Sequence, residues 1–320
     1  MAHPLIRFLA GSSGRDAVQA VMPRRTFDDV VLPPRTRRAL HQALAQVTSH
    51  DLMFRQWGLG ERHPTGLALA FHFAGPPGTG KTICADAIAH ALGRTLLIVR
   101  YAELESMWLG ETPKHVAAVF RRARDTNSVL FFDEADAIAS RRSSAPDLGA
   151  MRETNTAVNV LLQELEAFTG VVIFATNMAA NLDPAFERRV RTHVLFELPG
   201  VGEREQIWRV QMHPVLTPLG RDVDFRRLAE RFEASGGDIR NAVLKAALAA
   251  ASEAGPPETR AIGQHHLVDA MRDVLESKQV MRQSIATRDM TSMGATATLA
   301  TILSVCAFLI AIVALLVAVR

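Results

Sequence analysis

The sequence GPPGTGKT, residues 75–82, follows the apolar run LALAFHFA at 67–74 and precedes a helical pattern. It matches the pattern G-x-x-x-x-G-K-[ST] in the context that this pattern requires, after a strand and before a helix. Gly75, Gly78 and Gly80 let the backbone curl so that its N–H groups point at phosphate oxygens, at the positive end of the following helix. The stretch therefore predicts a phosphate-binding loop within an α/β fold.

Two side chains of this loop carry the chemistry expected of it. Lys81 would reach the β- and γ-phosphates of a nucleotide, and the hydroxyl of Thr82 would ligate Mg²⁺. We expect ATP and Mg²⁺ as the cofactors. The residues predicted to contact the nucleotide are Gly75, Pro76, Pro77, Gly78, Thr79, Gly80, Lys81 and Thr82.

Short apolar runs of strand length alternate with helical stretches around this loop. Between two of the runs, residues 156–168 have apolar side chains at the three- and four-residue spacing of a helix. The alternation predicts a P-loop NTPase fold, a mostly parallel sheet with helices on both faces. The runs lie at 67–74, 95–99, 128–132, 171–175 and 194–198.

Pro199 and Gly200 end the alternating part, and the pattern after them is helical. This change predicts a small all-helical second domain behind the α/β domain. The predicted organisation is a short N-terminal segment, an α/β nucleotide-binding domain, a helical domain and a polar linker, at residues 1–26, 27–200, 201–278 and 279–294.

The run VLFFDEAD, residues 129–136, is an apolar strand that ends in acidic residues. Asp133 at the strand tip can hold hydrated Mg²⁺, and Glu134 beside it can polarise the attacking water. The alternative is that these acids begin a helix, where negative charge is favourable. The phosphate-binding loop upstream favours the catalytic interpretation.

Composition limits the other classes of function. The formal net charge of +3 does not by itself indicate nucleic-acid binding, although arginines gather at residues 22–38. We interpret that cluster as a solvated face. Two cysteines, Cys84 and Cys306, do not make a disulfide framework, and they favour a reducing compartment.

The C-terminal run from Ala295 to Val319 contains no charged residue. A helix of about 20 apolar residues is long enough to cross a hydrocarbon core of about 30 Å. Residues 295–319 are therefore predicted to form a transmembrane tail anchor, with a buried helix of a soluble domain as the alternative. The positive-inside rule then places the rest of the chain in the cytoplasm, because three basic residues precede the run and one follows it, namely Lys278, Arg282, Arg288 and Arg320.

Residues of about 27–277 resemble the AAA+ ATPase superfamily, and within it the AAA clade of ring-forming unfoldases and remodellers. The phosphate-binding loop at 75–82 and the two acids Asp133 and Glu134 carry this resemblance. It implies an ATP hydrolase with a doubly wound nucleotide-binding domain and a helical lid. It also implies assembly as a homo-oligomeric ring, usually a hexamer.

Further site residues follow from the resemblance. Asn177 in the run ATN matches the first sensor, which positions water near the γ-phosphate; without the family it is a turn residue. The run LDPAFERRVRTHV, residues 182–194, resembles the segment with arginine fingers. Arg188 and Arg189 would reach the γ-phosphate of the neighbouring subunit, or lie at a solvated helix end. Glu187 departs from many relatives and leaves open which arginine dominates.

Two more segments are similar to family motifs. The run SGGDIRN, residues 235–241, resembles the second sensor, which would place Arg240 near the nucleotide unless it is a surface charge. The run ELESMWLGETPKH, residues 103–115, resembles the first pore loop of protein-translocating rings. Trp108 and Leu109 would then grip a polypeptide substrate, whereas an isolated tryptophan would pack on its own domain. A second pore loop would fall at 140–155, with an ordinary surface loop as the alternative.

The sequence thus predicts a membrane-anchored AAA+ ATPase that unfolds, extracts or remodels polypeptides, membrane proteins among them, at the cytoplasmic membrane surface. One alternative is an ATP-dependent assembly or disassembly factor, recruited to a membrane complex without pore translocation. A clamp-loader-like ATPase acting on nucleic acid is less favoured, because it has no need of Trp108. The sequence contains no His-Glu-x-x-His motif of a metalloprotease.

Overall fold

A computed structural model describes residues 17–62, 68–100, 112–136, 148–177, 184–190, 192–254 and 256–280. The chain divides into two compact units. The first unit consists of Met1–Pro214 and Phe225–Ile239, and the second of Val215–Asp224 and Arg240–Arg320.

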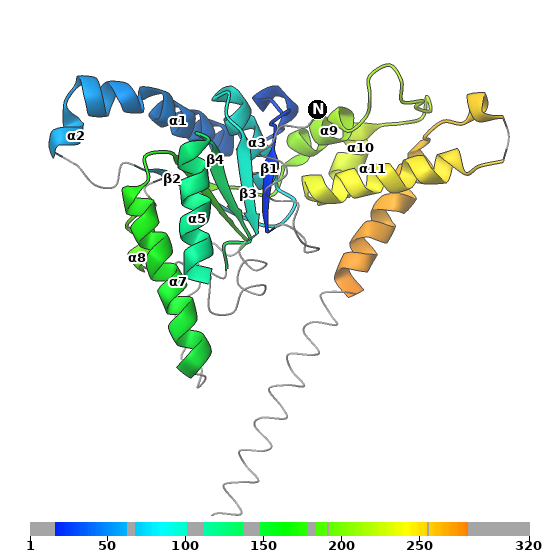
Figure 1. The fold of residues 1–320 in the computed structure, drawn as a ribbon. Helices are drawn as coiled ribbons and strands as arrows, with labels where there is room; N and C mark the ends of the chain where they lie inside the picture. Colours follow the sequence, from blue (N-terminus) through cyan, green and yellow to red (C-terminus); the bar gives the residue numbers. More distant parts are fainter. Residues whose placement is uncertain are drawn as a thin grey trace, which may run out of the picture. The chain divides into compact units, whose positions relative to one another are not determined.

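A six-stranded sheet lies at the centre of the first unit, with the strand order β1-β3-β4-β5-β2-β6 (Figure 1). Every neighbouring pair is parallel except β1 and β3. The mostly parallel sheet predicted from the sequence is therefore confirmed. The strands are β1 (Val18–Val21), β2 (Leu69–Ala74), β3 (Leu96–Arg100), β4 (Val129–Asp133), β5 (Val171–Thr176) and β6 (Thr192–Leu195).

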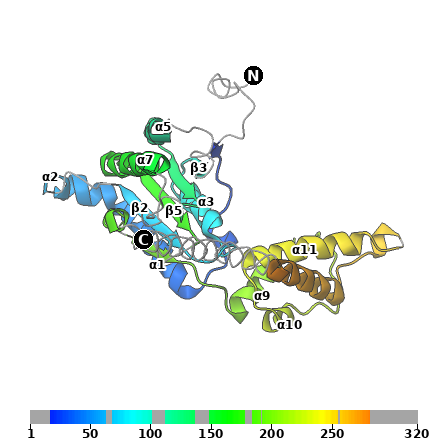
Figure 2. The same cartoon turned by 90° about the horizontal axis from the view of Figure 1, so that it is seen from below.

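The sheet is apolar on both faces, which explains why its central strands are continuous apolar runs. Neighbouring residues of a strand point to opposite faces, so Phe131 and Phe132 of β4 belong to two separate apolar clusters. On one face the cluster includes Phe120 of α5 (Thr112–Asp125) and Leu161 of α7 (Leu148–Ala167). On the other it includes residues of α1 (Pro34–Asp51) and α3 (Lys81–Ala91). Helices thus cover both faces, as Figure 2 shows.

The carboxyl ends of three parallel strands meet at one edge of the sheet. Ala74 at the end of β2 lies opposite Thr176 at the end of β5, and β4 runs parallel to β5 on its other side. Open parallel sheets bind ligands at this edge, because the loops after the strands converge there. The phosphate-binding loop, Asp133 and Asn177 all follow these strand ends.

The chain after Gly200 is helical in its described residues, as its pattern predicts, apart from loops and an isolated bridge. Its helices are α9 (Val201–Val210), α10 (Phe225–Arg231), α11 (Gly236–Ala251), the 3-10 turn η4 (Pro257–Thr259) and a helix at 264–280. The shorter elements before Gly200 are the 3-10 turn η2 (Phe27–Asp29), the π-helical turn η3 (Leu52–Gln56), α2 (Leu59–Arg62) and α8 (Pro184–Glu187). The domain boundaries predicted from the sequence stay predictions.

The prediction of a membrane protein is corrected here. A spanning helix needs about 20 predominantly apolar residues. Within the described ranges, no helix is both long enough and apolar enough to cross a membrane. Two of the longest, α7 with 20 residues and α1 with 18, both contain several charged residues. The predicted anchor at 295–319 lies outside the described residues, so its hydropathy is a property of the sequence alone, and the membrane localisation is not retained.

Candidate nucleotide site

The loop between β2 and α3 has the conformation of a phosphate-binding loop. Gly75, Gly78 and Gly80 all have positive φ values, 155°, 78° and 100°. A Cβ atom on Gly75 would collide with the carbonyl oxygen of Phe196, and one on Gly78 would lie 2.5 Å from Oγ of Ser235. Close backbone approach and positive φ together explain why these positions are glycine.

Lys81 is held beneath this loop by its own chain. Its side chain is 8 % exposed. Nζ donates hydrogen bonds to the carbonyl oxygens of Gly75 (2.6 Å) and Pro76 (3.0 Å) and to Oδ1 of Asn177 (3.0 Å). An ammonium group has three donors, so a contact between Nζ and a phosphate requires that Nζ release or share one of these acceptors.

Two carboxylates act on the charge of this lysine. Burial lowers the pKa of Lys81 below its ordinary value, and the negative charges of Asp133 and Asp136 oppose that shift. Asp133 is half-buried at the end of β4, and Asp136 lies three residues further along the chain. The electrostatic coupling places the loop and the acidic end of β4 in a single site.

Glu134 has a backbone conformation that is rare for its residue type. Its φ is 52°, in the left-handed region that non-glycine residues seldom occupy. The Glu134 N–H donates to Oδ1 of Asp133 at 3.0 Å, and the N–H of Ala135 donates to the carbonyl oxygen of Ala175 at 2.9 Å. These bonds hold the strained turn in place. Strain of this kind clusters at functional sites, and here it falls on the predicted catalytic acid.

Asn177 joins the lysine to a residue that the sequence analysis missed. Its side-chain oxygen accepts from Lys81, and its backbone N–H donates to the carboxylate of Asp136 at 3.1 and 3.3 Å. Asp136 thereby fixes the backbone of the residue that contacts the loop lysine. The available signal was the run DEAD, because a turn after the strand brings its last acid back to the sheet edge.

The two predicted arginine fingers differ in their surroundings. Arg189 donates to Oε1 of Glu166 through Nε (2.7 Å) and Nη2 (2.6 Å), and to the carbonyl oxygen of Ala185 through Nη1 (2.8 Å). Arg188 is exposed and makes no hydrogen bond or ion pair with any residue that the structure describes. Of these two arginines, Arg188 is the one whose guanidinium group is not bonded to another described residue.

Other predicted site residues are placed as follows. Thr82 is exposed on the first turn of α3. Arg240 is exposed on α11, in the second unit. Trp108 and Leu109 lie outside the described residues. Of the predicted second pore loop at 140–155, the last eight residues are helical, because α7 begins at Leu148.

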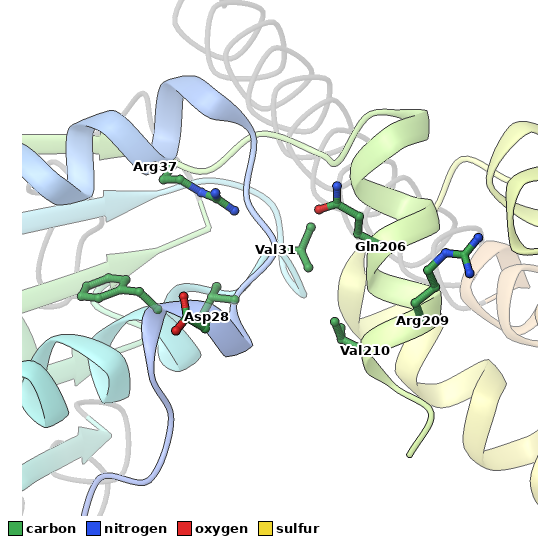
Figure 3. Close-up of a pocket in the computed structure, with 8 residues that line it drawn as sticks. Asp28, Val31, Arg37, Gln206, Arg209 and Val210 are labelled. Atoms are coloured by element: carbon green, nitrogen blue, oxygen red, sulfur yellow. The ribbon is translucent and has the colours of Figure 1, made fainter. Parts of the chain in front are cut away.

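A cavity of about 290 Å³ lies in the first unit between the segment before α1 and helix α9. In Figure 3 the side chains of Asp28, Val31 and Arg37 lie on one side of it and those of Gln206 and Val210 on the other. Residues 24 and 25, which precede the lining residues Phe27 and Asp28, are fixed to α3, because the N–H groups of Arg24 and Arg25 donate to Asp86 at 3.2 and 2.7 Å. Its lining residues are Phe27, Asp28, Val30, Val31, Arg37, Gln206, Arg209 and Val210.

In the second unit, Glu253, His265 and His266 have ligand atoms within 4.8 Å of one another. The N–H of Gly263 donates to Nδ1 of His266 at 3.1 Å, so Nε2 carries the hydrogen that Glu253 accepts at 2.9 Å. A neutral imidazole has one lone pair on nitrogen, and here that lone pair is used. The arrangement therefore fastens the start of the helix at 264–280 to the end of α11 and does not form a metal site.

Comparison with known proteins identifies the family. Residues 71–198 match the family described as "ATPase family associated with various cellular activities (AAA)". A Cell division cycle protein 48 homolog of Archaeoglobus fulgidus is 33% identical over 240 residues, which cover 72% of this chain and 31% of that protein. The ATP-dependent zinc metalloprotease FtsH 3 of Sphaerobacter thermophilus is 35% identical over 260 residues, covering 78% and 51%. Katanin p60 ATPase-containing subunit A1 of Strongylocentrotus purpuratus is 32% identical over 249 residues, covering 74% and 46%.

The match includes the residues around the phosphate-binding loop, but not the cavity lining, Ser235 or Arg240. It begins on β2 and ends just after β6, so it contains the loop, the acids, Asn177 and both arginines. The chain spans about a third to a half of the length of these relatives. At the level of the family, the enzyme class predicted from the sequence is confirmed. Residues 71–198 therefore form an AAA ATPase domain, and the chain is similar to homologues of the Cdc48, FtsH and katanin proteins.

Proposed function

We propose that this protein binds ATP with Mg²⁺ and hydrolyses it within a homo-oligomeric ring, and that it uses the energy to remodel polypeptides. The observation that carries the ATPase part is the contact between Lys81 and Asn177 at 3.0 Å. It joins the phosphate-binding loop to the end of β5, beside the acids at the end of β4. Loop, lysine, acids and polar sensor thus form one connected group.

The residues present fit a magnesium ion. Thr82 offers an exposed hydroxyl and Asp133 a half-buried carboxylate at the strand end, and Mg²⁺ prefers hard oxygen ligands of these kinds. Bound there, Mg²⁺ would neutralise charge on the phosphates. The loop N–H groups would bind the phosphates, Lys81 would stabilise the negative charge that develops on them, and Glu134 would take a proton from the attacking water. Asn177 would orient that water.

Arg188 is the residue that we propose to act on a neighbouring subunit. It is exposed and uncommitted, whereas Arg189 is bonded to Glu166 and Ala185. An arginine supplied by a neighbour can stabilise the charge of the transition state by about 10³-fold or more. We assign to Arg189 the role of fixing the segment from which Arg188 extends.

The cavity between the segment before α1 and α9 is the proposed site of the adenine base. Its lining combines apolar side chains with a few polar ones, as small-molecule sites do. The bonds from Arg24 and Arg25 to Asp86 tie one of its walls to the helix that begins at the loop. Irradiation with 8-azido-ATP should label peptides within 24–38 or 201–212, and excess ATP should prevent this. Labelling confined to other peptides would rule out the cavity.

The polypeptide substrate is supported by the names of the relatives and by the expected pore residue Trp108. FtsH 3 is named an ATP-dependent protease, and the katanin subunit is named as containing an ATPase. The alternative is an assembly or disassembly factor that does not thread its substrate. No described residue favours an action on nucleic acid.

The experiment that tests the proposal compares wild-type protein with Glu134→Gln and Lys81→Ala. Wild type should release phosphate from ATP only with Mg²⁺. Glu134→Gln should bind a fluorescent ATP analogue as wild type does but hydrolyse about 100-fold more slowly, since it keeps the loop and loses the base. Lys81→Ala should lose binding. A wild-type protein that binds ATP but never hydrolyses it would contradict the ATPase.

A second arm tests the substrate. A fluorescent protein with an unstructured tail should lose its fluorescence only with ATP and wild-type protein, and Trp108→Ala should abolish that loss while ATP hydrolysis continues. If the tagged protein stays folded while a stable partner complex is taken apart, the non-threading alternative is the better account.

A further inference from the structure

A hydrogen-bonded chain of two imidazole groups and one hydroxyl group crosses the sheet beneath the phosphate-binding loop. Nδ1 of His72 lies 3.2 Å from Nδ1 of His193, and Nε2 of His72 lies 2.8 Å from Oγ1 of Thr176. His72 is 2 % exposed and Thr176 is fully buried, whereas His193 is exposed. The chain therefore runs from the surface of the edge strand β6, through β2, to β5.

The register of the sheet produces this chain. His72 of β2 lies directly opposite His193 of β6, and Ala74 lies opposite Thr176 of β5. Thr176 is thus a diagonal neighbour of His72 on the same face, within reach of a long side chain. Phe71 and Phe73, on either side of His72, point to the other face and belong to an apolar cluster there. A polar histidine in a central strand is costly unless both nitrogens have partners, and here both do.

His72 is neutral at ordinary pH. Burial and, to a lesser extent, the neighbouring His193 lower its pKa to about 4, and the negative charge of Asp136 opposes the shift. A neutral imidazole has one donor and one acceptor, so the two hydrogen bonds of His72 are linked. If His193 donates to Nδ1, His72 must donate from Nε2 to Thr176; if Thr176 donates to Nε2, His72 must donate to His193. A change at either end of the chain reverses the bond at the other end.

Thr176 connects this chain to the phosphate site. Its carbonyl oxygen accepts the N–H of Gly75, the first residue of the loop, at 3.2 Å. The next residue is Asn177, which contacts Lys81 and Asp136. His72 therefore fixes the side chain of Thr176. The carbonyl group of Thr176 binds the first residue of the loop, and the next residue in the chain is the polar sensor Asn177.

The other end of the chain connects to the arginine segment. β6 begins at Thr192, three residues after Arg189, and His193 is its second residue. β6 pairs only with β2 among the described strands, and the bond between His72 and His193 is a side-chain hydrogen bond that joins this edge strand to β2.

We propose that His72 is a positioning residue of this ATPase, which couples the strand after the arginine segment to Thr176 and thereby to Asn177 and the loop. The inference rests on the proposed ATP hydrolysis. A movement of Arg188 toward a neighbouring subunit would shift β6, and the paired hydrogen bonds would transmit that shift to the residue beside the sensor.

The first test separates catalysis from binding and from stability. His72→Leu fills the same space and removes both bonds. We expect its kcat to fall about tenfold while KM for ATP stays within about twofold, because the lost interaction acts in the transition state. Its thermal midpoint should fall, because the fully buried hydroxyl of Thr176 loses its hydrogen-bond partner, so kcat and KM are compared at a temperature well below that midpoint. An unchanged kcat would overturn the proposal.

Conservative and control variants distinguish coupling from packing. His72→Gln keeps a donor near the position of Nε2 and should recover most of kcat. His193→Ala, at an exposed position, should lower kcat about threefold. Thr192→Val is the matched control, because Thr192 lies beside His193 and bonds instead to Gln46 at 2.9 Å; its kcat should equal that of wild type. Equal effects of His193→Ala and Thr192→Val would contradict a specific role for the histidines.

A double-mutant cycle locates the route. If the coupling passes through Thr176, then His72→Leu combined with Thr176→Val should lower kcat no more than His72→Leu alone, because each variant breaks the same contact. Effects that multiply would show that the two residues act separately and would overturn the proposed route.

A last measurement does not depend on hydrolysis. ¹⁵N NMR of the imidazole groups in protein without nucleotide reports which nitrogen of His72 carries hydrogen. His193→Ala should change the His72 signals and the backbone amide signal of Asn177. An unaffected Asn177 would refute the coupling even if wild type hydrolyses ATP. A wild-type protein without ATPase activity would refute the proposed function. The NMR result would then still decide whether His193, His72 and Thr176 are coupled.

Discussion

Asn177 is the acceptor through which Lys81 reaches beyond its own loop, and its charge offers a test of the site at the scale of one residue. Asn177→Asp would place a carboxylate 3 Å from an ammonium group that is largely buried. The attraction between opposite charges at this distance adds to the existing hydrogen bond, so Lys81 would be held more firmly to the protein, and the added negative charge would repel phosphate.

We therefore expect Asn177→Asp to weaken ATP binding about tenfold or more. Asn177→Ala should bind ATP as tightly as wild type and hydrolyse it more slowly, because it removes the sensor but adds no charge. Titration with a fluorescent nucleotide measures both affinities. Unchanged affinity in Asn177→Asp would mean that Lys81 does not need to exchange Asn177 for phosphate.

The neutral state of His72 makes stability depend on pH. Its pKa is 6.5 in the unfolded chain and about 4 in the fold. Between these values the unfolded chain binds more protons than the folded protein, so stability is present above pH 6.5 and is lost as the pH falls toward 4. The loss attributable to this one group is about 3 kcal/mol, at about 1.4 kcal/mol for each pH unit.

His72→Leu should remove this part of the pH dependence. The free energy of unfolding in urea, measured from pH 7.5 to pH 4.5, should fall less steeply in the variant than in wild type. Carboxylates titrate in both proteins, so the difference between the two curves isolates the histidine. Parallel curves would show that His72 takes up its proton in the folded state at an ordinary pH.

At the scale of elements, the start of α11 is built as a capping box beside the loop. Ser235 Oγ accepts the N–H of Asp238 at 3.2 Å, and the carboxylate of Asp238 accepts the N–H of Ser235 at 3.0 Å. The same helix start touches the nucleotide loop, because the N–H of Gly237 donates to the carbonyl oxygen of Gly78 at 3.0 Å. The cap therefore positions the first turn of α11 against the loop as well as beginning the helix.

Asp238→Ala should cost about 1 to 2 kcal/mol in free energy of unfolding, the range for a lost helix cap. Because the loop is hydrogen-bonded to this helix start through Gly78 and Gly237, nucleotide affinity should fall as well. Urea denaturation and nucleotide titration measure the two effects. Asp269→Ala is the control, since Asp269 lies exposed on the helix at 264–280 and pairs only locally with Arg272. Equal losses in both variants would argue against a role for the cap at the loop.

The elements that sequence reasoning found and missed differ in one physical respect. Strands β2 to β5 are marked by apolar runs, because burial on both faces selects such residues. The predicted run at 194–198 overlaps β6 only at Val194 and Leu195, because β6 begins with the polar residues Thr192 and His193. β1 was missed because its residues Val18–Val21 are only half-buried or exposed, so its pattern is weak. The side chains of the loop and Asp133 were found because phosphate chemistry fixes their type and spacing. His72, Asp136 and Glu166 were missed because their roles depend on partners that only the fold brings close.

For the whole molecule, the different surroundings of Arg188 and Arg189 allow a test of assembly. If Arg188 acts on a neighbour, an active site needs an intact loop from one subunit and an intact arginine from the next. Lys81→Ala lacks the first and Arg188→Ala the second, so each protein alone should be inactive. In a random 1:1 mixed ring, about a quarter of the interfaces combine an intact loop with an intact arginine.

The mixture should therefore recover about a quarter of the wild-type rate of phosphate release, provided that interfaces act independently. Lys81→Ala mixed with Glu134→Gln is the control. Both of these changes damage the same side of the interface, so no mixed interface is intact and no activity should return. Activity in the control would mean that the preparation is contaminated with an active ATPase. If neither mixture recovers activity, Arg188 does not complete the site of a neighbouring subunit.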